Sequence, residues 1–374
     1  MKEIDDIIPI LLANKKIIDN FDAYEFNFID NFWKEKCQNI KDILNSDNFK
    51  CLDNISYKYQ KEINVIFSFS NDSLNINPEK NYENFKNNIL LDIQLTLDEN
   101  DPKEINLIEI NKISEGKNIT KKFRLIPSIL EIINYTISVI KMFLFFNPKN
   151  YSKILLDFHD ILCSYINLSN DIVLEFKGLI KILTKNELAS SYSSINLIQQ
   201  IINHFIFFIS NNKAIEEDIK AKYNFLETLS KEYMQKNLFK LMNVIKEGIY
   251  ESSINEFKKI ISLEKYPIVE GDVPVNSFAL KLIILVNDVY KALKHCYEND
   301  IVSKIILDNL NLFCRELEKL FENKKELSGE EKKQFKRDFI FIRKNIDIRI
   351  EDIDFKGFKK EINSLYRKGE NNKK

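Results

Sequence analysis

Apolar residues recur every three or four positions along most of this chain, which is the spacing of one face of an α-helix. The clearest example is residues 184–210. This stretch opens with Thr184 and Glu187 at capping-box spacing. Its second half is apolar nearly all round, which is typical of a helix buried on most sides. We predict that this helix lies in the protein core, and the positions expected to be buried are Leu188, Ile195, Ile198, Ile202 and Phe205.

The same period predicts further helices along the chain. They are expected over residues 21–44, 123–146, 148–166, 171–183, 214–247, 252–263, 277–297, 301–321 and 328–346, with a shorter basic segment at 355–366. Residues 70–103 are rich in Asn and Asp, which favour turns, and are expected to form a surface insertion with room for a short helix over 82–95. Residues 105–113 alternate apolar and polar positions, and fit either a strand or an irregular segment.

This pattern predicts an all-α protein built as an elongated stack of antiparallel helices. The expected organisation is a lead-in at 1–20, an N-terminal bundle at 21–170, a C-terminal bundle at 171–350 and a basic tail at 351–374. Composition supports long helices, because only 7 glycines and 7 prolines occur in 374 residues.

Charge and cysteine content narrow the class of protein. The formal net charge is −1, so no overall field draws the chain to nucleic acid. The 5 cysteines form no CxxC pair, which favours free thiols in a reducing cytosol. Acidic residues near the N-terminus stand where a signal peptide would carry basic ones, so none is expected.

Residues 123–146 are the most hydrophobic part of the chain and the one stretch long enough to span a bilayer. Glu131, Asn134, Ser138 and Lys141 make a polar stripe along it. A charge at the bilayer centre costs roughly 2.5–3.5 kcal/mol on the insertion scale. We therefore expect a buried amphipathic helix and no transmembrane segment.

No catalytic or cofactor motif is present. GxGxxG, GxxxxGK[ST] and GxSxG are all missing from the sequence. No two of His159, His204 and His295 have metal-ligand spacing on one helix face. Asp157, His159 and Asp160 resemble a carboxylate–imidazole cluster, but consecutive helical positions diverge, and a solvated face is the expected arrangement. The chain is predicted not to be an enzyme, with no cofactor and no metal.

Basic residues gather on one predicted helix near the C-terminus. This side is either an ordinary solvated face or a contact surface for anionic lipid headgroups or a partner, since a basic residue near such a membrane contributes about 1 kcal/mol. The candidate surface residues are Lys332, Lys333, Lys336, Arg337, Arg343 and Lys344.

The stretch Leu183-Thr184-Lys185-Asn186-Glu187-Leu188-Ala189-Ser190-Ser191, followed by the apolar run to Ser210, resembles the carboxy-terminal part of the vacuolar-protein-sorting subunit fifty-four family. Upstream, residues 123–140 and 171–179, with Gly178, are similar to the family's apolar helix and its approach segment. Downstream, Val273-Pro274, residues 306–320 and residues 335–345 follow the family's order. The resemblance covers about residues 20–350. It departs at 53–55, and the family's amino-terminal coiled-coil region is not seen.

The resemblance implies the helical-rod fold of multisubunit tethering complexes. It implies a subunit of a Golgi-associated retrograde protein (GARP)-like complex, acting in retrograde transport from endosomes to the trans-Golgi network and in SNARE-mediated fusion. Expected partners are other tethering subunits, SNAREs and small GTPases, with a cytoplasmic location, peripheral on trans-Golgi network and endosome membranes. The alternatives are a related tether (the syndetin-containing complex or exocyst), a peripheral lipid-binding helical protein, and an enzyme with an unfamiliar site.

Overall fold

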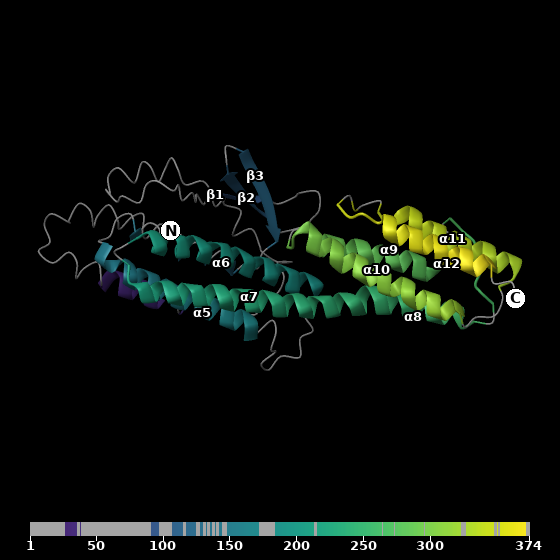
Figure 1. Cartoon of the computed structure of the whole chain (residues 1–374), viewed down its shortest axis with the longest axis horizontal. Helices are drawn as coiled ribbons and strands as arrows, with labels where there is room; N and C mark the ends of the chain where they lie inside the picture. Colours follow the sequence, from purple (N-terminus) through teal and green to yellow (C-terminus); the bar gives the residue numbers. More distant parts are fainter. Residues whose placement is uncertain are drawn as a thin grey trace, which may run out of the picture. The chain divides into compact units, whose positions relative to one another are not determined.

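The computed structural model describes residues 27–35 and 38, three strands between 91 and 124, a turn at 128, isolated helical positions from 129 to 143, and residues 148–171, 184–212 and, with short gaps, 215–371. Helices that pack against one another make up most of this part of the chain, so the fold class is all-α, as predicted (Figure 1).

The helices are α5 (Tyr151–Asn170), α6 (Lys185–Asn211), α7 (Glu217–Ile245), α8 (Ser252–Ile261), α9 (Ser277–Leu293), α10 (Asn299–Glu322), α11 (Gly329–Asn345) and α12 (Lys356–Asn371). A short 3₁₀ turn, Pro148–Asn150, precedes α5, and a π-helical segment, Lys246–Glu251, joins α7 to α8. The predicted helix over 214–247 therefore ends earlier, and Gly248 lies within the π-helical segment. The predicted helix over 171–183 lies outside the described residues.

Two compact units divide the chain. One comprises Met1–Leu183 with Ser190–Leu238, and the other comprises Thr184–Ala189 with Phe239–Lys374. The division falls inside α7 instead of near residue 170, where the sequence placed it. The first part of α7 packs on α5 and α6 through Tyr223 and Tyr233, which keeps it with the preceding helices.

A small antiparallel sheet accompanies the helices, in the order β1 (Leu91–Thr96), β2 (Leu107–Ser114) and β3 (Lys117–Arg124). The alternating segment at 105–113 thus forms a strand, with Ile110 opposite Ile93 and Lys121. The short helix considered for 82–95 is wrong at positions 91–95. The helix predicted from residue 123 also begins too early, because β3 extends to Arg124 and the described helical positions begin at Ile129.

An aromatic cluster forms the core of the first unit. The ring centroid of Phe205 lies 5.4 Å from that of Phe158 on α5 and 5.9 Å from that of Tyr223 on α7. The Tyr223 hydroxyl also donates a hydrogen bond to the carbonyl of Leu155, at 3.0 Å. Figure 1 shows α5, α6 and α7 running alongside one another. The side chains of Leu188, Ile195, Ile198, Ile202 and Phe205 are all buried.

The start of α6 is held by the predicted capping box. The backbone N–H of Thr184 donates to Glu187 Oε2 at 2.8 Å, and the N–H of Glu187 donates to Thr184 Oγ1 at 3.3 Å. Two donors that the helix cannot satisfy internally thereby find acceptors in local side chains.

Replacing Thr184 by alanine removes the acceptor for the Glu187 N–H. We expect the free energy of unfolding to fall by about 1 kcal/mol, the usual contribution of such a cap. Urea denaturation of the two proteins measures the change. Ser210→Ala, at an exposed position near the other end of α6, is the control. An equal loss in both variants would show that the cap is not the cause.

The second unit contains α8 to α12, and its last helix corrects a prediction. Residues 351–374 were expected to form a basic tail, with a shorter basic segment at 355–366. Instead α12 packs against α10 and α11. Helix α12 is amphipathic, and the residues of its buried side are Phe358, Ile362 and Leu365. Phe355, just before the helix, is buried as well. Burial of these side chains stabilises a helix whose charge pattern alone suggested a solvated end.

Among the described residues, no helix is both long enough and apolar enough to cross a membrane. Residues 123–146 are described only in part. The positions resolved within 129–143 are buried, and they include Ile132, Val139 and Met142.

Candidate functional site

Helix α11 turns a polar face toward the interior of the second unit. Ser328 and Glu331 form the predicted capping box at its start. Glu331 has a second role, because its Oε1 accepts a hydrogen bond from the backbone N–H of Tyr266 at 2.5 Å. The carboxylate that caps α11 therefore also holds the segment that follows α8.

Two turns further along, Asp338 is fully buried and accepts four hydrogen bonds. The donors are the Tyr266 hydroxyl at 2.7 Å, the Asn276 backbone N–H at 2.9 Å, the Asn276 side-chain amide at 2.8 Å and the Gln334 side-chain amide at 3.0 Å. A buried carboxylate is tolerated when donors surround it in this way. Asp338 is the centre of what we call the α11 polar cluster: Tyr266, Asn276, Glu331, Gln334 and Asp338.

Gln334 connects this cluster to two further points of the preceding loop. Its amide nitrogen donates to the carbonyl of Pro274 at 2.9 Å, and its carbonyl oxygen accepts from the Val269 N–H at 3.4 Å. These hydrogen bonds to α11 side chains hold the loop between α8 and α9. Tyr266 and Val275 of the same loop are also buried.

The electrostatics of the cluster are set by burial. Desolvation raises the pKa of Asp338, and the hydrogen bonds from Asn276, Tyr266 and Gln334 oppose that rise. Desolvation and the neighbouring Asp338 carboxylate raise the pKa of Tyr266, so its hydroxyl remains a donor. All four donors to Asp338 belong to this chain. The cluster therefore links the loop between α8 and α9 to helix α11 through hydrogen bonds.

The six basic residues predicted as a surface lie on the opposite side of α11. Lys333, Arg337 and Lys344 are exposed, and Lys332, Lys336 and Arg343 are half-buried. The guanidinium of Arg337 donates to Gln334 Oε1 at 3.2 Å, and that of Arg343 donates to Asn363 of α12 at 3.2 Å. The structure therefore places these residues on one helix, and Arg343 joins that helix to α12.

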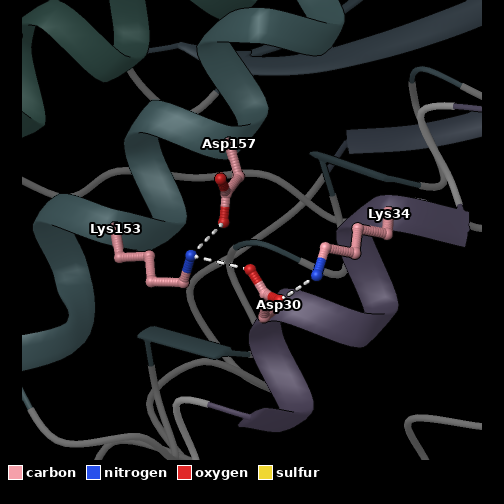
Figure 2. A network of polar contacts seen from close by, with 4 residues as sticks. All are labelled: Asp30, Lys34, Lys153 and Asp157. Carbon is pink, nitrogen blue, oxygen red and sulfur yellow. Dashed lines mark hydrogen bonds and ion pairs between the residues drawn. The ribbon is translucent and has the colours of Figure 1, made fainter.

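A second charged cluster lies in the first unit, where the helix of residues 27–35 meets α5. Figure 2 shows Lys153 between two carboxylates, 3.3 Å from Asp30 Oδ1 and 3.5 Å from Asp157 Oδ2. Asp30 is also paired with Lys34, at 2.5 Å. Hydrogen bonds from the two lysines lower the pKa of Asp30, whereas desolvation raises the pKa of Asp157. Sequence periodicity gave no sign of this cluster, because Asp30 and Lys153, which join its two local pairs, are 123 positions apart in the chain.

Replacing Lys153 by methionine should lower stability by about 1 kcal/mol near neutral pH, since Asp157 keeps its partly buried charge without the cation. The pKa of Asp157 already lies above its unfolded value, so the native state takes up the proton first as the pH falls. The deficit should therefore shrink in mildly acidic buffer. Thermal melts at both pH values check this, with Lys231→Met at the exposed Lys231–Glu227 pair as the control. A deficit independent of pH would contradict it.

The expected solvated face at 157–160 is wrong for two of its three residues. Asp157 is partly buried, and the side chain of His159 is 12% exposed. The imidazole Nδ1 lies 3.0 Å from Asp160 Oδ1, and the ring packs near Tyr223. Its burial arises because α7 covers this part of α5. No group of three or more potential metal ligands occurs within the described ranges. His295 and the side chain of His204 lie outside them.

Three cysteines are described, and all are free thiols. Cys296 and Cys314 are buried, and Cys163 is half-buried. Burial raises the pKa of the Cys163 thiol, which disfavours the reactive thiolate.

No family model matches the chain, and no curated protein matches it.

Proposed function

We propose that this chain is a non-enzymatic helical scaffold that acts as a subunit of a GARP-like vesicle-tethering complex. The sequence resemblance, carried by the order of its segments, is the source of the specific assignment. The observation that supports it in the fold is that α5, α6 and α7 contact one another, and that α9 to α12 pack together, as long neighbouring helices. The proposed rod-like stack, retrograde transport role and trans-Golgi network or endosome location follow from the same resemblance.

Such a scaffold would act by exposing side chains on its surface to which partner proteins bind. Aromatic side chains are enriched in protein interfaces. Phe225 and Phe239 on α7 are 58% and 69% exposed, and Phe207 on α6 is 46% exposed. We propose that partner helices, from other tethering subunits or SNAREs, bind such side chains by laying their apolar faces against them. Small GTPases are the third proposed class of partner. No cofactor takes part.

Affinity purification of the tagged chain, with chemical crosslinking before lysis, tests the assignment. Recovery of GARP subunits supports it. Recovery of syndetin-complex or exocyst subunits instead would assign the chain to a related tether. Phe239→Asp provides the matched variant, since it changes an exposed side chain and should weaken partner recovery without unfolding the chain. If no tethering subunit, SNARE or GTPase is recovered, the proposal is wrong.

A peripheral lipid-binding protein is the second candidate, and one observation favours it. The exposed sides of α11 and α12 both carry basic residues. This candidate needs no partner proteins, so a chain that binds vesicles but recovers no tethering subunits would support it over the first.

A further inference from the structure

Two neighbouring helices of the second unit carry exposed basic residues at the same spacing. On α11 they are Lys333, Arg337 and Lys344, and on α12 they are Lys356, Lys360 and Arg367. In each helix the positions are i, i+4 and i+11, which places all three on one side. We call these six residues the basic face.

The two sets belong to one surface because α11 and α12 lie side by side (Figure 1). Arg343 of α11 bonds to Asn363 of α12, and Lys359 of α12 bonds to Asp347 just after α11. The lower-numbered end of α12 therefore meets the far end of α11, and the helices are antiparallel. Basic residues line both sides of this seam.

The acidic residues of these helices are directed elsewhere or already engaged. Glu331 and Asp338, the two internal carboxylates of α11, are buried and bonded within the α11 polar cluster. Glu361 of α12 lies beside the Cys314 thiol of α10. Asp347 pairs with Lys359 at the seam. Asp354 lies 3.7 Å from Lys356, itself a member of the basic face, at the start of α12. Among the acidic residues of these two helices whose side chains the structure describes, Glu330 remains, exposed in the first turn of α11. Because Glu331 and Asp338 point into the protein, the exposed side of α11 is predominantly cationic.

We propose that the basic face binds the anionic headgroups of a lipid bilayer. This inference rests on the proposed function and identifies where such a tethering subunit would touch the vesicle or target membrane. The cations are spread along two helices, each about 25 Å long at 1.5 Å per residue. A bilayer surface offers negative charge with the same lateral spread, and lysine, which supplies four of the six, acts as a point charge toward phosphate without a fixed geometry. Half-buried Ile340 lies between Arg337 and Lys344 and adds apolar area at the same surface.

Vesicle sedimentation of the purified full chain tests the proposal. Phosphatidylcholine vesicles are compared with vesicles that also contain phosphatidylserine, at low and at high salt. The variants are K333E/R337E/K344E on α11 and K356E/K360E/R367E on α12. K246E/K291E/K304E, which changes exposed lysines of the π-helical segment, α9 and α10 by the same net charge, is the control. Circular dichroism melts verify that each variant is folded, and Lys/Arg→Gln versions replace any that is not.

We expect binding only to the phosphatidylserine vesicles, weakening at high salt. Each face variant should lose affinity by about tenfold or more, and the control should stay within about twofold of the wild type. Equal losses in face and control variants, or no binding by the wild type, would overturn the proposal. The proposal would also be overturned if the face variants lost binding to polyglutamate or to duplex DNA while their binding to vesicles stayed unchanged. The chain can fail this assay and still recover tethering subunits, so the two proposals fail independently.

Discussion

Replacing Phe205 by alanine is expected to lower the free energy of unfolding by about 3–5 kcal/mol. The Phe205 ring is 1% exposed and lies between Phe158 of α5 and Tyr223 of α7, and it also packs against Phe143 at 6.3 Å. Truncation removes the transfer free energy of the ring and leaves a cavity where three helices meet. A loss of this size is a large fraction of the stability of an ordinary domain.

Phe207→Ala is the matched control for this change. Phe207 lies two positions along α6 and is 46% exposed, so the same chemical truncation on the same helix should change stability by less than about 1 kcal/mol. Chemical denaturation monitored by circular dichroism measures both. Similar values for the two variants would mean that α6 does not form the core described above.

Replacing Asp338 by alanine should destabilise the second unit by a comparable amount, about 3–5 kcal/mol. The substitution leaves donors on Tyr266, Asn276 and Gln334 without their acceptor inside the protein. The loop between α8 and α9 should lose its hydrogen bonds to Asp338 and keep those to Glu331 and Gln334. Hydrogen exchange at the Asn276 amide, which donates to Asp338, should accelerate with the fall in stability.

Asp338→Asn separates charge from hydrogen bonding in the same cluster. The amide retains one acceptor oxygen, so the loss should be smaller than that of the alanine variant. Burial raises the pKa of Asp338 above its unfolded value, so the wild type gains stability from this group as the pH falls, and the Asn variant does not. Asp308→Ala, at an exposed position on α10, is the control. If Asp338→Ala and Asp308→Ala have the same free energy of unfolding, Asp338 contributes no more than an exposed charge, and the prediction is wrong.

Local patterns predicted the helices well, and α6 shows why. Its apolar period specifies which side is buried, and Thr184 and Glu187 specify where it begins, from residues within two turns of one another. Ser328 and Glu331 did the same for α11. Capping and amphipathic burial depend on neighbours three or four positions away, so one sequence contains the information needed.

The small sheet and α12 were predicted less well. Residues 91–96 alternate apolar and polar side chains, but this short strand was overlooked because it lies in a segment rich in Asn and Asp. It pairs with β2, more than ten positions away. The basic composition of 355–366 suggested a solvated end, yet Phe358 and Ile362 give it a buried side once α10 and α11 are present. In both cases a partner distant in sequence decides the outcome.

The sequence by itself determined the all-α class, most helix positions, the two capping boxes and the buried side of α6, because each depends on contacts a few residues apart. The tertiary structure decided which charges are inside and which are outside. Asp338 and Asp157 have no mark that distinguishes them from exposed aspartates. They are buried because α11 faces the loop between α8 and α9, and because α5 faces the helix of residues 27–35. The basic face of α11 and α12 has the same origin. Glu331 and Asp338 of α11 accept hydrogen bonds inside the fold, whereas the basic residues lie at the surface.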